Sequence, residues 1–344
     1  MNSGAFGAIR QRREVLGLGL AESADLDPND ENFCLYGTHE KCLPVLWIGS
    51  RSIQLPTLGG NNGEAGPINA RGQVAGTVET AIRDSACPGT VAPNGTGPQV
   101  LDYKGVIWGP HRNQMRTLQP LPGDTVTIAL WINDEGEAVG ISGTCANTVI
   151  PPIAYGPHAV RWDRRGVPHD VGNLGSTAAN AALSINNWGE VVGASSTTDQ
   201  SNAFNGTFAF LWNRERGIHP LGALPGDVAS GAQAINDKRD ITGLSIDPQG
   251  NPRAVLWQHG FIADLNELTV EDSPFSVLLD AFSTNDAGEI VGFGVTTSGD
   301  IHGFLLTPCE RSDDGWYPET HVNRQAIPSY LRDIVRDRLG MHQN

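Results

Sequence analysis

The densest group of hard oxygen ligands lies in residues 25–32, which read Asp-Leu-Asp-Pro-Asn-Asp-Glu-Asn. Carboxylate and amide oxygens are the ligands that calcium prefers in proteins. We therefore take Asp25, Asp27, Asn29 and Asp30 as candidate calcium ligands. The run lacks the glycine at position six and the glutamate at position twelve of an EF-hand loop, so it is not that motif. The alternative reading is a solvated acidic loop that holds no ion.

Other residues that could recognise a ligand recur at matching places along the chain. Asp124 and Asp227 each end a Leu-Pro-Gly-Asp phrase, where they serve either as binding groups or as turn caps. His158 and His302 begin equivalent segments, and His39 is a further candidate for binding. The sequence contains no Gly-x-Ser-x-Gly elbow, phosphate-binding loop or His-Glu-x-x-His motif. No catalytic residue is therefore assigned.

The five cysteines are Cys34, Cys42, Cys87, Cys145 and Cys309. None forms a Cys-x-x-Cys pair, so a zinc ribbon is excluded. Cys34 and Cys42 lie in one loop, whereas Cys87 and Cys145 lie in equivalent loops of consecutive repeats. We expect a bridge within each pair, which leaves Cys309 free. Scattered reduced thiols in a cytosolic protein are the alternative.

The elements that must position these residues are repeats. One phrase consists of an apolar residue (Thr in the last copy) and Asn, a short turn usually ending in Gly, and a second apolar segment ending in Gly. It occurs at residues 9–17 in a worn form, and at 68–76, 132–140, 185–193, 235–243 and 284–292. Asn and Asp bond to their own backbone and tolerate left-handed geometry, and Gly adopts positive φ without strain. Each copy therefore predicts a tight β-hairpin.

A second phrase alternates with the first and is an apolar strand that ends in Trp in five of its six copies. The copies lie at 44–47, 105–108, 159–162, 209–212, 254–257 and 303–306. Most are followed by the Leu-Pro-Gly-Asp type of phrase, so each unit of about 50 residues holds about four short strands. The simplest role for the Trp residues is packing between units, and an aromatic platform for sugars is the alternative.

Six such units predict an all-β fold, a six-bladed β-propeller spanning residues 1–308. We expect the ring to close because an open stack leaves unpaired sheet edges, and strands from the two chain ends would share one blade. Residues 309–344 lie outside the repeat, and the apolar spacing in residues 329–339 predicts a short C-terminal helix.

Composition limits the partners. The formal net charge of −15 argues against binding nucleic acid or an anionic membrane. No stretch is long and apolar enough to span a membrane, and we expect a monomer. No signal peptide is recognised after the basic start of the chain. Since the first repeat begins almost at Met1, a leader missing from this sequence remains a hypothesis.

The phrases Ala-Phe-Leu-Trp (209–212), Leu-Gly-Ala-Leu-Pro-Gly-Asp (221–227) and Ile-Asn-Asn-Trp-Gly-Glu-Val-Val-Gly (185–193) resemble the HAF-type extracellular repeat proteins of bacteria. The histidine of that repeat has counterparts in His158 and His302. The chain departs from the pattern at Arg10, where Asn is expected, and at Leu306, where Trp is expected. The resemblance implies a secreted, periplasmic or cell-surface β-repeat protein. It provides no catalytic residues.

Unequal loops give the best indication of where function lies. The connection between the hairpin and the Trp strand is long in the first three units, at 18–42, 77–104 and 141–157, and short in the last three. Long loops on a rigid scaffold commonly form binding sites. We therefore expect a binding scaffold for a glycan, a protein or a small ligand. The alternative is a propeller hydrolase or lyase that uses loop carboxylates at the mouth of the funnel.

Overall fold

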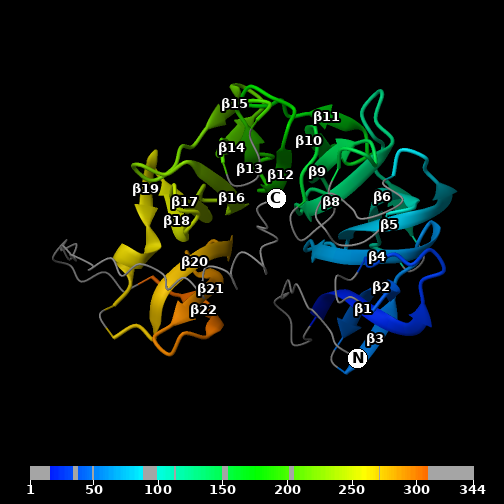
Figure 1. The fold of residues 1–344 in the computed structure, drawn as a ribbon, viewed down its shortest axis with the longest axis horizontal. Coiled ribbons are helices and arrows are strands. Elements are labelled where there is room, and N and C mark those ends of the chain that lie inside the picture. Colours follow the sequence, from blue (N-terminus) through cyan, green and yellow to red (C-terminus); the bar gives the residue numbers. More distant parts are fainter. Residues whose placement is uncertain are drawn as a thin grey trace. The chain divides into compact units, whose positions relative to one another are not determined.

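The computed structural model describes residues 16–33, 38–48, 50–87, 99–111, 114–148, 154–200, 205–270 and 272–308. Apart from one short 3-10 helix, the regular structure of these residues is β-strand. The strands form six antiparallel sheets, and each sheet is a meander in which neighbours along the chain pair (Figure 1). The predicted all-β class is therefore confirmed. The described residues contain no helix that is long and apolar enough to cross a membrane.

The first sheet has the order β1-β2-β3 and the last β20-β21-β22, and the four between them have four strands each. The first two sheets contain β1 (Leu16–Leu26), β2 (Glu40–Ile48), β3 (Arg51–Gln54), β4 (Gly59–Ile68), β5 (Val74–Arg83), β6 (Leu101–Trp108) and β7 (Met115–Thr117). The next two contain β8 (Val126–Ile132), β9 (Ala138–Gly143), β10 (His158–Trp162), β11 (Pro168–Asp170), β12 (Asn180–Ile185), β13 (Val191–Ser196), β14 (Thr207–Asn213) and β15 (Gly217–Pro220). The last two contain β16 (Ala229–Ile235), β17 (Ile241–Ile246), β18 (Pro252–Gln258), β19 (Phe261–Asp264), the 3-10 helix η1 (Leu265–Leu268), β20 (Phe275–Thr284), β21 (Ile290–Thr296) and β22 (Ile301–Leu306).

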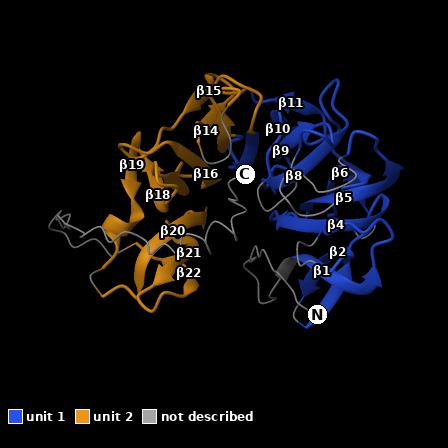
Figure 2. Ribbon diagram, viewed as in Figure 1, with its two compact units in different colours: residues 1–172, 180–189 blue, residues 173–179, 190–344 orange. Residues whose placement is uncertain are grey.

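The chain divides into two compact units, shown in different colours in Figure 2. The first unit comprises residues 1–172 and 180–189, and the second comprises residues 173–179 and 190–344. The predicted division into a propeller of residues 1–308 and an extension of residues 309–344 stays a prediction. The predicted C-terminal helix falls outside the described residues.

The repeated phrases form the elements that the sequence predicts. Every described copy of the first phrase, the hairpin phrase, joins two adjacent strands of one sheet. All six copies of the second phrase lie in strands β2, β6, β10, β14, β18 and β22. Four turns place a glycine at positive φ, for example Gly136 at 81°. In the fifth, Arg239 takes this conformation at φ 68°. The left-handed turn is therefore a property of the repeat that one copy keeps without glycine.

The glycine that ends each hairpin phrase has a different role, which is to permit a close approach of two strands. A Cβ atom on Gly140 would lie 1.9 Å from the carbonyl oxygen of Ile128 in β8. A Cβ on Gly292 would lie 2.0 Å from the carbonyl oxygen of Asp280 and 2.4 Å from the Phe304 ring. The register of each strand pair shifts at this point, so the glycine lies opposite a β-bulge.

The turn asparagines join consecutive repeats. The Asn133 side chain accepts a hydrogen bond from the Glu137 amide of its own turn and donates one to the carbonyl of Asn186 in the next turn, at 3.0 Å. Asn69 donates in the same way to the carbonyl of Asn133, and in the second unit Asn236 donates to the carbonyl of Asn285. These asparagines are buried, with 4 to 5% of their surface exposed. We call this row of side chains the asparagine ladder.

Tryptophan side chains add a second contact between neighbouring sheets. The indole N–H of Trp108 donates to the carbonyl of Pro56, which follows the outer strand of the preceding sheet, and Trp162 donates similarly to Gln119. Trp108, Trp162 and Trp257 are at most 4% exposed. The packing interpretation is therefore correct for these three residues, and they are too buried to form a platform for sugars.

The ladder predicts that asparagines at the same place in two hairpin turns differ in importance. Replacing Asn133 with Ala removes a buried bond to the next repeat as well as its turn bond, so we expect it to lower the free energy of unfolding by about 2–3 kcal/mol. Asn285→Ala is the matched control, because the exposed Asn285 bonds only to Ala287 and Glu289 of its own turn through its side chain among the described residues. We expect this change to cost about 1 kcal/mol. Equal losses in chemical denaturation would show that the ladder contributes nothing beyond the turn.

Candidate functional site

The long loops of the first unit meet in one apolar cluster. Phe33 comes from the β1–β2 loop, Cys87 from the β5–β6 loop and Cys145 from the β9–β10 loop, and all three pack with Tyr103 and Ile141 of the sheets. The Tyr103 hydroxyl donates to the carbonyl of Thr148 in the third loop at 3.0 Å. The three loops are therefore packed against the sheets and against each other.

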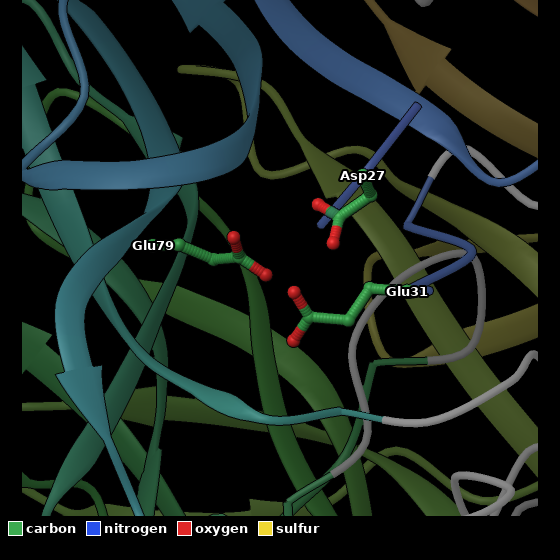
Figure 3. Close-up of side chains that lie close together, drawn as sticks. All are labelled: Asp27, Glu31 and Glu79. Carbon is green, nitrogen blue, oxygen red and sulfur yellow. The ribbon is translucent and has the colours of Figure 1, made fainter. Parts of the chain in front are cut away.

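Three carboxyl groups lie together under these loops. Asp27 and Glu31 come from the β1–β2 loop, and Glu79 comes from β5. One oxygen from each lies within 4.8 Å of the others, and the side chains point toward one another (Figure 3). Their exposed fractions are 6% for Asp27, 1% for Glu31 and 0% for Glu79. We call these residues the acidic cluster.

Amide groups surround the cluster. The Asn62 side chain donates to Asp27 at 2.8 Å and to Glu79 at 3.1 Å, and Gln99 donates to Glu79 at 3.1 Å and to Glu31 at 3.3 Å. One oxygen of Glu31 also accepts the backbone amides of Val100 and Leu101, and one oxygen of Glu79 accepts those of Asn61 and Asn62. Glu31 in the first loop thereby holds the end of the second loop.

Burial and mutual repulsion change the acidity of the cluster. Burial raises the pKa of Glu79 to about 8, and repulsion by Glu31 adds to this effect. Burial also raises the pKa of Glu31, although the backbone bonds from Leu101 and Val100 oppose the shift. No lysine or arginine is hydrogen-bonded to the three carboxyl groups among the described residues. The cluster therefore stays neutral in part by keeping protons, or it holds a cation in their place.

Each carboxyl group of the acidic cluster keeps an oxygen with lone pairs that are free to bind a cation. Asp27 Oδ2, Glu31 Oε2 and Glu79 Oε1 each accept a single hydrogen bond within the described part of the chain. Oxygens on opposite sides of a calcium ion lie about 5 Å apart, whereas those around magnesium lie about 4 Å apart. The oxygens of the three residues lie within 4.8 Å of one another, so a calcium ion fits among them, although this separation alone does not distinguish calcium from magnesium.

Two of the four predicted calcium ligands lie at this cluster. Asp27 is a member of it, and the Asn29 side chain donates to Glu31 at 3.3 Å. Asp25 is exposed, and the side chain of Asp30 is 83% exposed. A calcium site made by the loop residues alone stays a prediction, and the geometry favours an arrangement that includes Glu31 and Glu79.

The paired aspartates have contacts that explain their recurrence. Asp124 accepts a hydrogen bond from the Ser142 hydroxyl at 2.7 Å, and Asp227 accepts one from Ser245 at 2.6 Å. Asp227 also pairs with Arg253 at 2.7 Å. Each aspartate therefore fastens its Leu-Pro-Gly-Asp loop to the neighbouring strand of its own sheet.

None of the three candidate histidines is a member of the acidic cluster, although the His39 carbonyl accepts the Asp27 amide at 2.8 Å. His158 lies 3.6 Å from the carboxylate of Asp170. His39 takes a left-handed φ of 55°, and its ring lies 2.7 Å from the backbone oxygen of Asp30. His302 is exposed on β22. None of them joins a group of metal ligands among the described residues.

The bridge expected between Cys87 and Cys145 is present. It links loops of consecutive sheets across 58 residues, a span for which loop closure is worth about 4 kcal/mol in the unfolded chain. Cys42 is also disulfide-bonded, and the predicted pair Cys34–Cys42 and the free Cys309 involve residues outside the described ranges. The three cysteines in the described ranges, Cys42, Cys87 and Cys145, lie in the apolar cluster under the loops.

Sequence reasoning missed Glu79 because it lies inside a strand. A signal was present in the repeat: the residues three places after the hairpin glycine in the other copies are Gly143, Ser196, Ile246 and Val295. A carboxylate at a position that is otherwise small or apolar is costly to bury without a partner. The unusual residue at this repeat position, Glu79, therefore indicates the acidic cluster.

Comparison with known proteins gives little further help. No protein-family profile matches the chain, and no curated protein matches it. Among solved structures, the chain is similar to the beta-propeller domain of the Trilobed protease from Pyrococcus furiosus, which is described as having an open velcro topology. The two are 7% identical, and the match covers 88% of this chain and 94% of that domain, with a TM-score of 0.38. This TM-score is too low to establish a shared fold.

The acidic cluster predicts a distinctive dependence on pH. Without divalent cations, Glu79 keeps its proton in the folded chain up to about pH 8 but loses it near 4.5 when unfolded. The folded state then binds more protons between these values, so we expect stability to fall as the pH rises from about 5 to about 8. Calcium is expected to reverse this loss, since it replaces the protons. Thermal unfolding in chelator and in calcium at both pH values measures the effect.

Glu79→Gln tests the assignment, because the amide resembles the protonated acid and carries no charge. We expect this variant to lose the response to calcium and the part of the pH-dependent decrease that Glu79 contributes, while the decrease due to Glu64 and Asp280, whose pKa burial raises to about 7, remains. Glu215→Gln, on an exposed turn, keeps the full wild-type behaviour. A wild-type midpoint that is unaffected by calcium at about pH 8 would mean that protons alone neutralise the cluster.

Proposed function

We propose that this chain is a secreted, periplasmic or cell-surface protein of the HAF-repeat type, and that it binds a ligand through the long loops of its first three repeats. The observation that carries the proposal is the cross-linking of these loops. The disulfide joins the second loop to the third, and Glu31 joins the first loop to the second. Long loops usually order at an entropic cost on binding, and loops held in place beforehand avoid it.

We further propose that the six sheets are blades of one β-propeller. Support comes from the six successive meanders, from the repeat length of about 50 residues and from the asparagine ladder within each unit. A propeller presents the loops of one face together, which suits a binding surface built from several repeats.

Location outside the cytosol is supported by cysteine chemistry. Disulfides form and persist in oxidising compartments, and the bridge between Cys87 and Cys145 is part of the apolar cluster under the loops. The HAF resemblance points to the same compartments. The net charge of −15 is compatible with a well-solvated exported protein.

The hydrolase or lyase reading has weaker support. A catalytic carboxylate must reach its substrate. The carboxyl groups that the loops bring together are at most 6% exposed, and Asp124 and Asp227 are bonded to serines of their own sheets. A structural role for these carboxyl groups is therefore better supported than a catalytic one.

A glycan is the ligand class to test first. We expect the oxidised, full-length chain to bind a restricted set of glycans on an array. The double variant Cys87→Ser/Cys145→Ser should bind them about tenfold more weakly, because the loops lose their pre-ordering. Gln249→Ala, in the short loop between β17 and β18, is the control and should bind as the wild type does. Equal binding by the double variant would contradict the proposal that the long loops form the binding site. An array on which no glycan binds would show that the ligand is not a glycan of the kinds tested.

The proposed location predicts the state of the thiols in the cells that make the protein. If cells are lysed in an alkylating reagent without reductant, Cys87 and Cys145 should remain unmodified in denatured protein analysed by mass spectrometry. Both should become modified after reduction, which is the internal control. Alkylation of the two residues before reduction would contradict an oxidising compartment.

A further inference from the structure

Within the part of the chain that the structure describes, the sixth sheet ends in a strand whose outer edge has no partner. Among the described residues, β22 pairs only with β21. The equivalent strands β6, β10, β14 and β18 each pair with a fourth strand on their other side (Figure 1). Unpaired edges of this kind attract further strands, and proteins usually cover them. The sheet therefore has a place for one more strand.

The preceding sheets show which backbone groups that strand would meet. In three of them, a carbonyl at one register position accepts an amide from just after the fourth strand: Gly105 from Leu118, Ala159 from Val171, and Ala209 from Leu221. The counterpart in β22 is Gly303, since it precedes Phe304, which pairs with the repeat glycine Gly292. Along a strand, the backbone N–H and C=O groups of successive residues point alternately to the two neighbouring strands. The amide and carbonyl of Leu305 therefore also point to the open edge.

The sequence after β22 contains a segment that matches a fourth strand. In the fourth sheet this strand is Gly217–Pro220, which reads Gly-Ile-His-Pro, and its glycine has a φ of 69°. Glycines at positive φ also precede the fourth strands of the third and fifth sheets, as Gly166 and Gly260. Residues 315–318 read Gly-Trp-Tyr-Pro and follow two aspartates, which favour a turn.

We propose that residues 315–319 pair with β22 as the fourth strand of the sixth sheet. The register follows from the fourth sheet, where Ile218 lies opposite Trp212, His219 opposite Leu211, and Pro220 opposite Phe210. By this correspondence Trp316 lies opposite Leu306 and Tyr317 opposite Leu305. Tyr317 and Leu305 exchange two backbone hydrogen bonds.

The position of the proline supports this register. Pro220 occupies β15 without an N–H group because its partner Phe210 directs its backbone groups to the strand on the other side, where it pairs with Gly193. Pro318 falls opposite Phe304, which pairs with Gly292 in the same way. A proline at this place costs no hydrogen bond, and prolines within sheets are confined to such edges.

The segment that follows β22 is the best candidate to cover the edge of β22, because it begins directly beside it in the sequence. Strand β22 ends at Leu306, and only residues 307–314 separate it in sequence from the proposed strand. Closing so short a loop costs little entropy compared with capturing a separate chain. A segment from the N-terminus or from a second copy of the protein is the alternative source of a strand.

Hydrogen–deuterium exchange at the Leu305 amide of the full chain tests the proposal. We expect this amide to exchange at least about tenfold more slowly than in an unstructured peptide. Tyr317→Pro removes the N–H that would bond to Leu305, so it should abolish the protection. Asn323→Pro places the same residue in the tail beyond the proposed strand, and it should leave the protection unchanged.

Three results would overturn the proposal. The first is unprotected exchange of Leu305 in the wild type, and the second is protection that persists in Tyr317→Pro. The third is protection that appears only at concentrations where light scattering detects a dimer, because a second copy would then supply the strand. None of these results bears on ligand binding by the loops of the first unit, so the two proposals fail independently.

Discussion

The structure depends on one repeated interaction, the bond that a turn asparagine makes to the next turn. An asparagine side chain has an acceptor and a donor on one planar group. At Asn69, Asn133 and Asn236 the oxygen closes the residue's own turn while the nitrogen reaches the carbonyl of the following asparagine. Aspartate retains the first bond and lacks the donor for the second. A turn built only for local geometry accepts either residue, so the preference for asparagine here comes from the contact between repeats.

Close stacking of the repeats leaves their loops free to differ. The hairpin glycines, the bulges opposite them and the buried tryptophans act on the strands, at positions such as Gly140 and Trp162. The connections between the hairpin and the Trp strand take no part in these contacts among the described residues, so their length and chemistry change from one repeat to the next. The acidic cluster and the disulfide both occur in the first unit, where these connections are long. The scaffold supplies rigidity, and the unequal loops supply a site.

Much of the fold was predictable because it repeats. Asn, Gly and Trp recur at fixed places, and chance does not produce the same phrase five times with strand-forming neighbours. The disulfide between Cys87 and Cys145 was predictable for the same reason, since equivalent loops of adjacent repeats must lie side by side. The candidate site was only half predictable. Asp27 stands out because it lies in an acidic run. Glu79 lies in a strand 52 positions later, where its neighbours in the sequence give no indication of a functional group.

The sequence by itself determined the strand class, the turns and the pairing of the central cysteines, because these follow from local backbone preference and from periodicity. Only the tertiary structure decided which acidic residues meet. Asp25 and Asp30 belong to the same acidic run as Asp27 and Glu31, but their side chains are exposed. The backbone amides of Val100 and Leu101 draw Glu31 inward, and Asn62 joins Asp27 to Glu79. Those donors come from distant parts of the chain, and the folded loops bring them within hydrogen-bonding distance.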